Sequence, residues 1–124
     1  MPARPSPDET EERLIQFGSD AMELTKQFPP GMHGTHLARQ ITRSATAAAP
    51  NYAEARVAES RADFIHKMGI ALKELNETHV WLRMAAKKFV LNADFLNRLI
   101  AENRELCKIF VASIQTAKRN KDNR

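Results

Sequence analysis

Apolar residues recur every three or four positions along almost the whole chain, in four stretches separated by residues that break or cap helices. This spacing places them on one face of an α-helix, and no stretch alternates as a strand would. Amphipathic helices joined by short connections bury these faces by packing together. The sequence therefore predicts an all-α fold, an antiparallel up-down four-helix bundle. Its stripes are Leu14, Phe17, Ala21, Leu24 and Phe28; Leu37, Ile41, Ser44, Ala48, Tyr52 and Ala55; Phe64, Met68, Ala71, Leu75, His79 and Leu82; and Leu96, Leu99, Asn103, Leu106, Phe110 and Ile114.

Helix-capping and helix-breaking residues predict where these helices begin and end. The first helix should begin near Asp8, whose carboxylate can cap its free amides, and Pro29-Pro30-Gly31 should end it. The second follows a loop that reaches to about residue 34. Ser60 should cap the third helix, which runs to about residue 88, and Asn92 should cap the fourth.

Pro50 lies inside the second stripe, where it removes a backbone hydrogen bond and clashes with the carbonyl of Thr46. Because the apolar spacing continues past it, we expect a kink between residues 46 and 50. The resulting division of the chain is an extended segment at 1–7, the bundle at 8–118 and a basic tail at 119–124.

The composition is that of one small domain. The chain has 124 residues, a net charge of +4 and a single cysteine, Cys107, which cannot form an intrachain disulfide. No secretion signal and no apolar run of about 18 residues can be recognised, which predicts a cytoplasmic protein without a membrane partner. Cys107 is expected to be buried and inert.

The charges on the second and third helices suggest pairing. If these helices fold back at residues 58–59, Arg43 comes level with Glu74, and Arg39 with residues 77–78. Glu54 then lies level with residues 63–67. The interhelical salt bridges predicted in this way involve Arg39, Arg43, Glu54, Lys67, Glu74 and Glu77. Direct ligand binding by the same residues is the less favoured alternative.

Catalysis and metal binding receive little support. A carboxylate-bridged metal site in a bundle uses Glu-x-x-His on two helices, whereas the only comparable spacing here is Asp63 with His66. His33 and His36 lie three apart in the first loop, without a nearby Cys or carboxylate. No nucleophile, base and orienting group can be assembled. We therefore expect no catalytic residues, metal or cofactor, and a protein that is not an enzyme.

A second apolar line runs along the third helix, outside its core stripe. It contains Ile70, Trp81 and Met84, with Val80 beside them, on a face that should be polar in a monomeric bundle. Trp and Met are enriched in the cores of subunit interfaces, so these residues predict an oligomer interface. Scattered surface hydrophobic residues, or cover by a neighbouring helix or the N-terminal segment, are the alternatives.

Several motifs resemble the small four-helix-bundle proteins encoded within intervening sequences of bacterial 23S ribosomal RNA genes. They are Gln40-Ile-Thr-Arg-Ser44, Asn51-Tyr-Ala-Glu-Ala55, Ser60-Arg-Ala-Asp-Phe64, and Ala71-Leu-Lys-Glu-Leu-Asn-Glu77 with Trp81-Leu82. The resemblance covers about residues 13–115. It implies a homo-oligomer, typically a pentameric ring. Related accessory proteins of diversity-generating retroelements bind nucleic acid and a reverse transcriptase.

Two functions follow from these observations. The first is an oligomeric module that binds structured RNA, or other nucleic acid such as DNA, through phosphate contacts. The alternative is a scaffold for a protein partner such as a reverse transcriptase, without direct nucleic-acid binding. The basic residues left for phosphate contact are Arg56, Arg61, Arg83, Lys87, Lys88, Lys118, Arg119 and Lys121, with Arg98 and Arg104 as further candidates.

Overall fold

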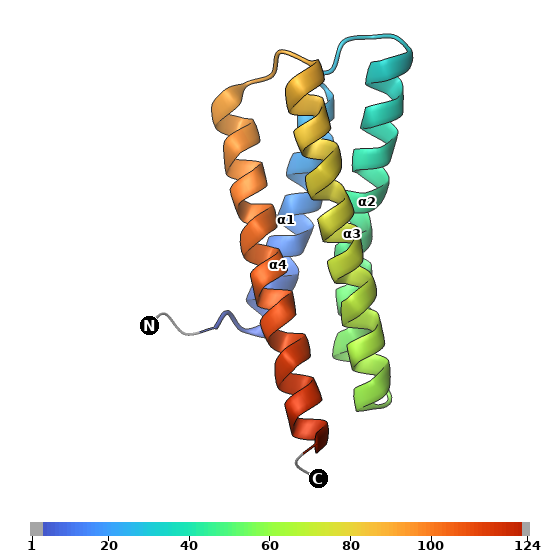
Figure 1. Cartoon of the computed structure of the whole chain (residues 1–124), viewed down its shortest axis with the longest axis vertical. Helices are drawn as coiled ribbons and strands as arrows, with labels where there is room; N and C mark the ends of the chain where they lie inside the picture. Colours follow the sequence, from blue (N-terminus) through green and yellow to red (C-terminus); the bar gives the residue numbers. More distant parts are fainter. Residues whose placement is uncertain (1–3, 123–124) are drawn as a thin grey trace.

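The structure, a computed structural model that describes residues 4–122, consists of four α-helices joined by short loops (Figure 1). Helix α1 spans Pro7–Thr25, α2 spans Met32–Arg56, α3 spans Arg61–Lys88 and α4 spans Ala93–Asp122. Each helix packs against the next one along the chain, and α1 also packs against α4. The predicted all-α, antiparallel up-down four-helix bundle is confirmed.

The first helix begins one residue earlier than its acidic run suggests. Ser6 is the N-cap, and its hydroxyl oxygen accepts a hydrogen bond from the Glu9 amide at 3.1 Å. Pro7 then occupies the first turn, where its missing N–H costs nothing. The prediction that Asp8 caps the helix is therefore wrong, although its charge still suits the positive end of the helix dipole.

The caps of the two later helices agree with the sequence. The hydroxyl oxygen of Ser60 accepts from the Asp63 amide at 3.0 Å. The side-chain oxygen of Asn92 accepts from the Phe95 amide at 2.9 Å. Each cap satisfies an amide that has no partner within its own helix, which fixes where α3 and α4 begin.

The loop between α1 and α2 begins and ends earlier in the sequence than expected. Helix α1 ends at Thr25, before the Pro29–Pro30 pair, and α2 begins directly after Gly31. Gly31 has φ 119°, a conformation that L side chains rarely adopt. Helix α2 then continues through Pro50 to Arg56. The proline therefore does not divide the helix into two elements.

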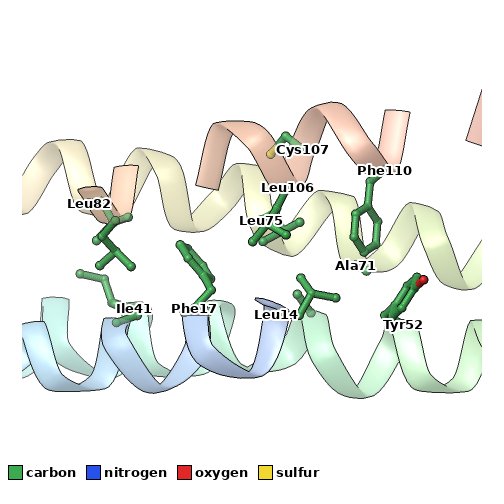
Figure 2. Close-up of a cluster of buried hydrophobic side chains, with 14 of the residues drawn as sticks. Leu14, Phe17, Ile41, Tyr52, Ala71, Leu75, Leu82, Leu106, Cys107 and Phe110 are labelled. Atoms are coloured by element: carbon green, nitrogen blue, oxygen red, sulfur yellow. The ribbon is translucent and has the colours of Figure 1, made fainter. Parts of the chain in front are cut away.

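The core consists mainly of the predicted stripes, although Phe28, Phe64 and Ile114 are only partly buried. Phe17, Leu75, Leu106 and Phe110 are among the side chains withdrawn from solvent, and Figure 2 shows them meeting between the helices. The rings of Tyr52 on α2 and Phe110 on α4 lie 5.4 Å apart, so opposite helices touch across the bundle. Each such large side chain contributes about 1.5–3 kcal/mol on full burial, which makes this core the main source of stability.

One core position on α3 differs from the prediction. Thr78 is fully buried, whereas His79, which the stripe assigned to the core, is only partly buried. The hydroxyls of Thr78 and Ser44 on α2 lie 2.7 Å apart and share a hydrogen bond. A threonine hydroxyl can thus be buried because α2 supplies its partner.

Asn103 is buried on α4, as its place in the fourth stripe predicts. Its side-chain nitrogen donates to the carbonyl of Leu75 at 2.9 Å. Its side-chain oxygen is buried and has no hydrogen-bond partner among the described residues. The α3–α4 interface therefore contains an incompletely satisfied amide.

Helix α4 continues beyond the expected end of the bundle. Residues 119–122 belong to this helix, so the part of the predicted tail that the structure describes is helical. Residues 123 and 124 lie outside the described residues, as do residues 1–3 of the predicted N-terminal segment. None of the helices within residues 4–122 is long and apolar enough to span a bilayer.

Candidate nucleic-acid interface

Basic residues divide into those held by carboxylates and those without such a partner. Arg56, a predicted phosphate contact, belongs to the first group. Its guanidinium lies 2.8 Å from Asp8 and 3.3 Å from Glu11, joining the end of α2 to the start of α1. An arginine between two carboxylates is largely neutralised, so Arg56 is a poor candidate for binding phosphate.

The α2–α3 interface holds most of the predicted interhelical pairs. Arg43 lies 3.2 Å from Glu74 and also contacts Glu77. Lys67 lies 3.2 Å from Glu54. The expected register between α2 and α3 is therefore the register observed.

Arg39 is the exception among these predicted pairs. Its side chain is exposed and has no ion-pair partner among residues 4–122. The physical reason is that Arg43 reaches both Glu74 and Glu77, which leaves no carboxylate at this level of α3 for Arg39.

A bridge between the first and last helices had no counterpart in the sequence analysis. Arg13 on α1 donates two hydrogen bonds to Glu102 on α4, at 2.9 and 2.6 Å. This parallel two-bond geometry is the strongest arrangement available to an arginine and a carboxylate. Because the partners are 89 residues apart, no local pattern indicates the pair.

The α3–α4 groove is different, because its cations have no carboxylate partner. Arg83 and Lys87 on α3 and Arg104 on α4 are exposed and form no ion pair within the described part of the chain. His79 lies among them, partly buried. We call His79, Arg83, Lys87 and Arg104, together with the hollow that Arg104 borders between α3 and α4, the basic groove.

Two of these charges act on the pKa of His79. Burial lowers it first, and the positive charges of Arg104 and Arg83 lower it further. Charges from two helices must lie close to the imidazole to act on it. Arg104 also borders an adjoining hollow of about 350 Å³, with Asn76 and Lys108 on its rim. Of the four named residues, Arg104 is the one that borders this hollow.

The other predicted phosphate contacts are spread over the molecule. Arg61 lies at the far end of α3, about 39 Å from Lys87 at 1.5 Å per residue, and it shares a hollow with Arg4. Lys118 and Arg119 are exposed near the end of α4. The structure therefore does not bring the predicted set into one patch.

Three further predicted phosphate contacts lie away from the basic groove. Lys88 borders a hollow on the α2 side of α3, away from Arg104. The guanidinium of Arg98 lies over the Phe95 ring at 5.8 Å, on the side of α4 that faces α1. Lys121 belongs to α4, but its side chain lies outside what the structure describes.

Apolar side chains are exposed near the start of α2 and toward the end of α3. Met32, Val80 and Met84 are 81%, 51% and 46% exposed. Trp81 is partly buried, and its ring meets that of His36 edge-on, with the ring centres 5.9 Å apart. We call Met32, Val80, Trp81 and Met84 the α2–α3 apolar surface. Ile70, the fourth predicted interface residue, is also partly buried.

Cys107 is buried, as expected. Its sulfur lies 3.6 Å from the side-chain oxygen of Asn76. Burial raises the pKa of its thiol, while Arg104 opposes the change. Because the thiolate is the reactive form, this thiol is poorly suited to nucleophilic chemistry.

The up-down arrangement of four helices, with charged pairs between α2 and α3, places the chain among small four-helix-bundle proteins. Residues 9–112 match the 23S rRNA-intervening sequence proteins, and the chain belongs to this family. The resemblance found in its motifs is therefore confirmed. No curated protein matches the chain.

A solved structure supports the same assignment. It is the crystal structure of a protein of unknown function from the S23 ribosomal protein family of Bacteroides thetaiotaomicron. The two chains are 29% identical, and the match has a TM-score of 0.79. It covers 88% of this chain and 97% of the other. The similarity therefore extends over nearly the whole bundle.

Proposed function

We propose that this chain is a non-enzymatic, cytoplasmic, homo-oligomeric bundle protein that binds structured RNA, or another nucleic acid, through phosphates in its basic groove. One observation carries the proposal. Arg83, Lys87 and Arg104 have no carboxylate partner within residues 4–122, whereas the cations between α1 and α2 and several of those between α2 and α3 do. Unpaired cations, of which Arg104 borders a hollow, provide the electrostatic attraction on which phosphate binding depends.

Oligomerisation strengthens this proposal. A ring, which we propose to be a pentamer, would repeat the groove and carry a formal charge of about +20, five times the +4 of one chain. Several weak phosphate contacts then act together on one nucleic acid. No aromatic base-stacking motif was recognised in the sequence, so we propose recognition by shape and phosphate rather than by base sequence.

The test is RNA affinity measured against salt concentration. Arg83→Gln/Arg104→Gln should lower affinity for a structured RNA at least about tenfold at low salt, and it should flatten the salt dependence by about one to two units of log–log slope. The matched control is Lys26→Gln/Lys67→Gln, which removes the same charge from cations that already have carboxylate partners. Equal effects of both variants, or no RNA binding by the wild type at low salt, would overturn the proposal.

A scaffold for a protein such as a reverse transcriptase is the second candidate. The exposed Val80 and Met84 support it, because contiguous apolar surface on a small protein favours protein contacts. This function predicts partner binding that is insensitive to Arg83→Gln/Arg104→Gln and is lost when the apolar surface becomes charged. Pull-down of the purified candidate partner with each variant distinguishes the two functions.

A further inference from the structure

Helix α1 carries a second unpartnered apolar line, on a different side of the bundle. Ile15 and Met22 are 49% and 43% exposed. They are seven residues apart, which places them on the same side of the helix, away from its core positions Leu14 and Phe17. We call Ile15 and Met22 the α1 stripe. One bundle thus presents two separate apolar contact surfaces.

The charges around these two surfaces are opposite in sign. Helix α1 contains six carboxylates, of which Asp8 and Glu11 pair with Arg56, whereas the exposed Glu9 and Glu12 have no ion-pair partner in the described part of the chain. Its exposed Glu12 lies within one turn of Ile15. Beside the α2–α3 apolar surface, Arg39 and Lys88 are exposed and have no ion-pair partner in the described part of the chain, while Arg43 occupies Glu74 and Glu77. The first surface is acidic at its edge and the second is basic.

We propose that α1 of one copy packs on the α2–α3 apolar surface of the next, so that the oligomer is built head to tail. This inference rests on the oligomer in the proposed function and names its two contact faces. Matching the apolar lines removes Val80, Met84, Ile15 and Met22 from water, and carboxylates then face cations at the rim. A symmetric contact of the α2–α3 apolar surface with itself would instead bring Arg39 and Lys88 toward their own copies.

The two contact faces have a consequence for symmetry. A contact between two different surfaces repeats from copy to copy, and it generates a closed ring or an open filament rather than an isolated dimer. Neither contact face includes a residue of the basic groove, although Val80 directly follows His79 on α3. Assembly and phosphate binding therefore use different residues.

The experiment uses two full-length variants, each altered on one face only. Val80→Glu/Met84→Glu places carboxylates where the acidic α1 should dock. Ile15→Lys/Met22→Lys places cations where the basic edge should dock. All four side chains are exposed, so both variants should keep wild-type helicity by circular dichroism. Masses are measured by light scattering, separately and after mixing in equal amounts.

Head-to-tail assembly predicts that each variant alone falls to the mass of a monomer, 14.0 kDa. The mixture should recover a complex of at least two chains, because each variant keeps the face that the other lacks. If Ile15→Lys/Met22→Lys keeps the full wild-type mass, α1 is not a contact face and the inference is wrong, although the oligomer stands. A monomeric wild type would overturn both, and RNA binding by that monomer would leave only the phosphate proposal standing.

Discussion

The two interfaces that α3 makes are built in opposite ways. Against α2, the buried hydroxyl of Thr78 donates to that of Ser44, which donates to the Gln40 carbonyl, and Arg43 and Lys67 reach carboxylates. Against α4, Asn103 keeps an unsatisfied oxygen, and Arg83 and Arg104 have no carboxylate partner among the described residues. The first interface pairs its polar groups within the protein, whereas the second leaves cations exposed and unpaired.

The first test compares a paired arginine on one interface of α3 with an unpaired arginine on the other. Arg43→Ala should destabilise the bundle by about 1 kcal/mol, because Glu74 and Glu77 lose their shared partner and then repel each other. Arg83→Ala, the matched control on the other interface, should change stability by less than about 0.5 kcal/mol. Urea unfolding at low salt measures both. Equal losses of unfolding free energy would mean that pairing with carboxylates does not make Arg43 more stabilising than Arg83.

Asn103 provides a test with the opposite sign. Asn103→Leu should stabilise the protein by about 1 kcal/mol, because it removes a buried oxygen that has no partner and replaces the amide with an apolar group of similar size. Asn103→Ala should instead destabilise by about 2 kcal/mol through the cavity that it leaves. The midpoint of urea unfolding distinguishes the two. Destabilisation by leucine would show that the hydrogen bond to Leu75 outweighs the unsatisfied oxygen.

The smallest effect is the pH dependence contributed by His79. Its folded pKa lies below the unfolded value near 6.5, because burial and the charges of Arg104 and Arg83 disfavour the imidazolium. The unfolded chain therefore binds the proton more readily. Stability from this residue is fully present above about pH 6.5 and is lost as pH falls toward the lower folded pKa.

His79→Gln removes this titration. As the pH falls from 7.5 to 5.5, the unfolding free energy of His79→Gln should rise relative to that of the wild type. Urea unfolding at both pH values measures this difference. Arg61→Gln is a suitable control, because it removes a cation at the far end of α3 and should leave the pH response unchanged. A wild-type response identical to that of His79→Gln would show that the basic groove does not hold the imidazole neutral.

The sequence predicted the bundle well because apolar spacing decides which helix faces are buried. Thr78 escaped prediction for a geometric reason: either a three-residue or a four-residue step from Leu75 fits a helix, and only contact with α2 selects the threonine. Ser6 was overlooked because the acidic run beginning at Asp8 gives a stronger local signal than a single serine. Helix α4 runs further than its apolar stripe because exposed residues can continue a helix without contributing to a core.

The candidate site was harder to predict, because it depends on which cations are paired with carboxylates. Nothing in the local sequence of Arg56 distinguishes it from Arg104, yet one meets two carboxylates and the other none among residues 4–122. Pairs between neighbouring antiparallel helices, such as Arg43 with Glu74, follow from counting back from the turn. Pairs between the first and last helices do not, and Arg13 with Glu102 is the example.

The contact between Arg4 and Thr116, 3.2 Å from guanidinium to hydroxyl, joins the beginning of α1 to the last turns of α4. The same arrangement of helices could therefore be built from a chain that visits them in a different order. A short linker between these two points, with a new opening in the loop at residues 89–92, would produce a circular permutant in the order α4, α1, α2, α3. The Arg13–Glu102 bridge would then join consecutive helices and form over a much shorter stretch of chain.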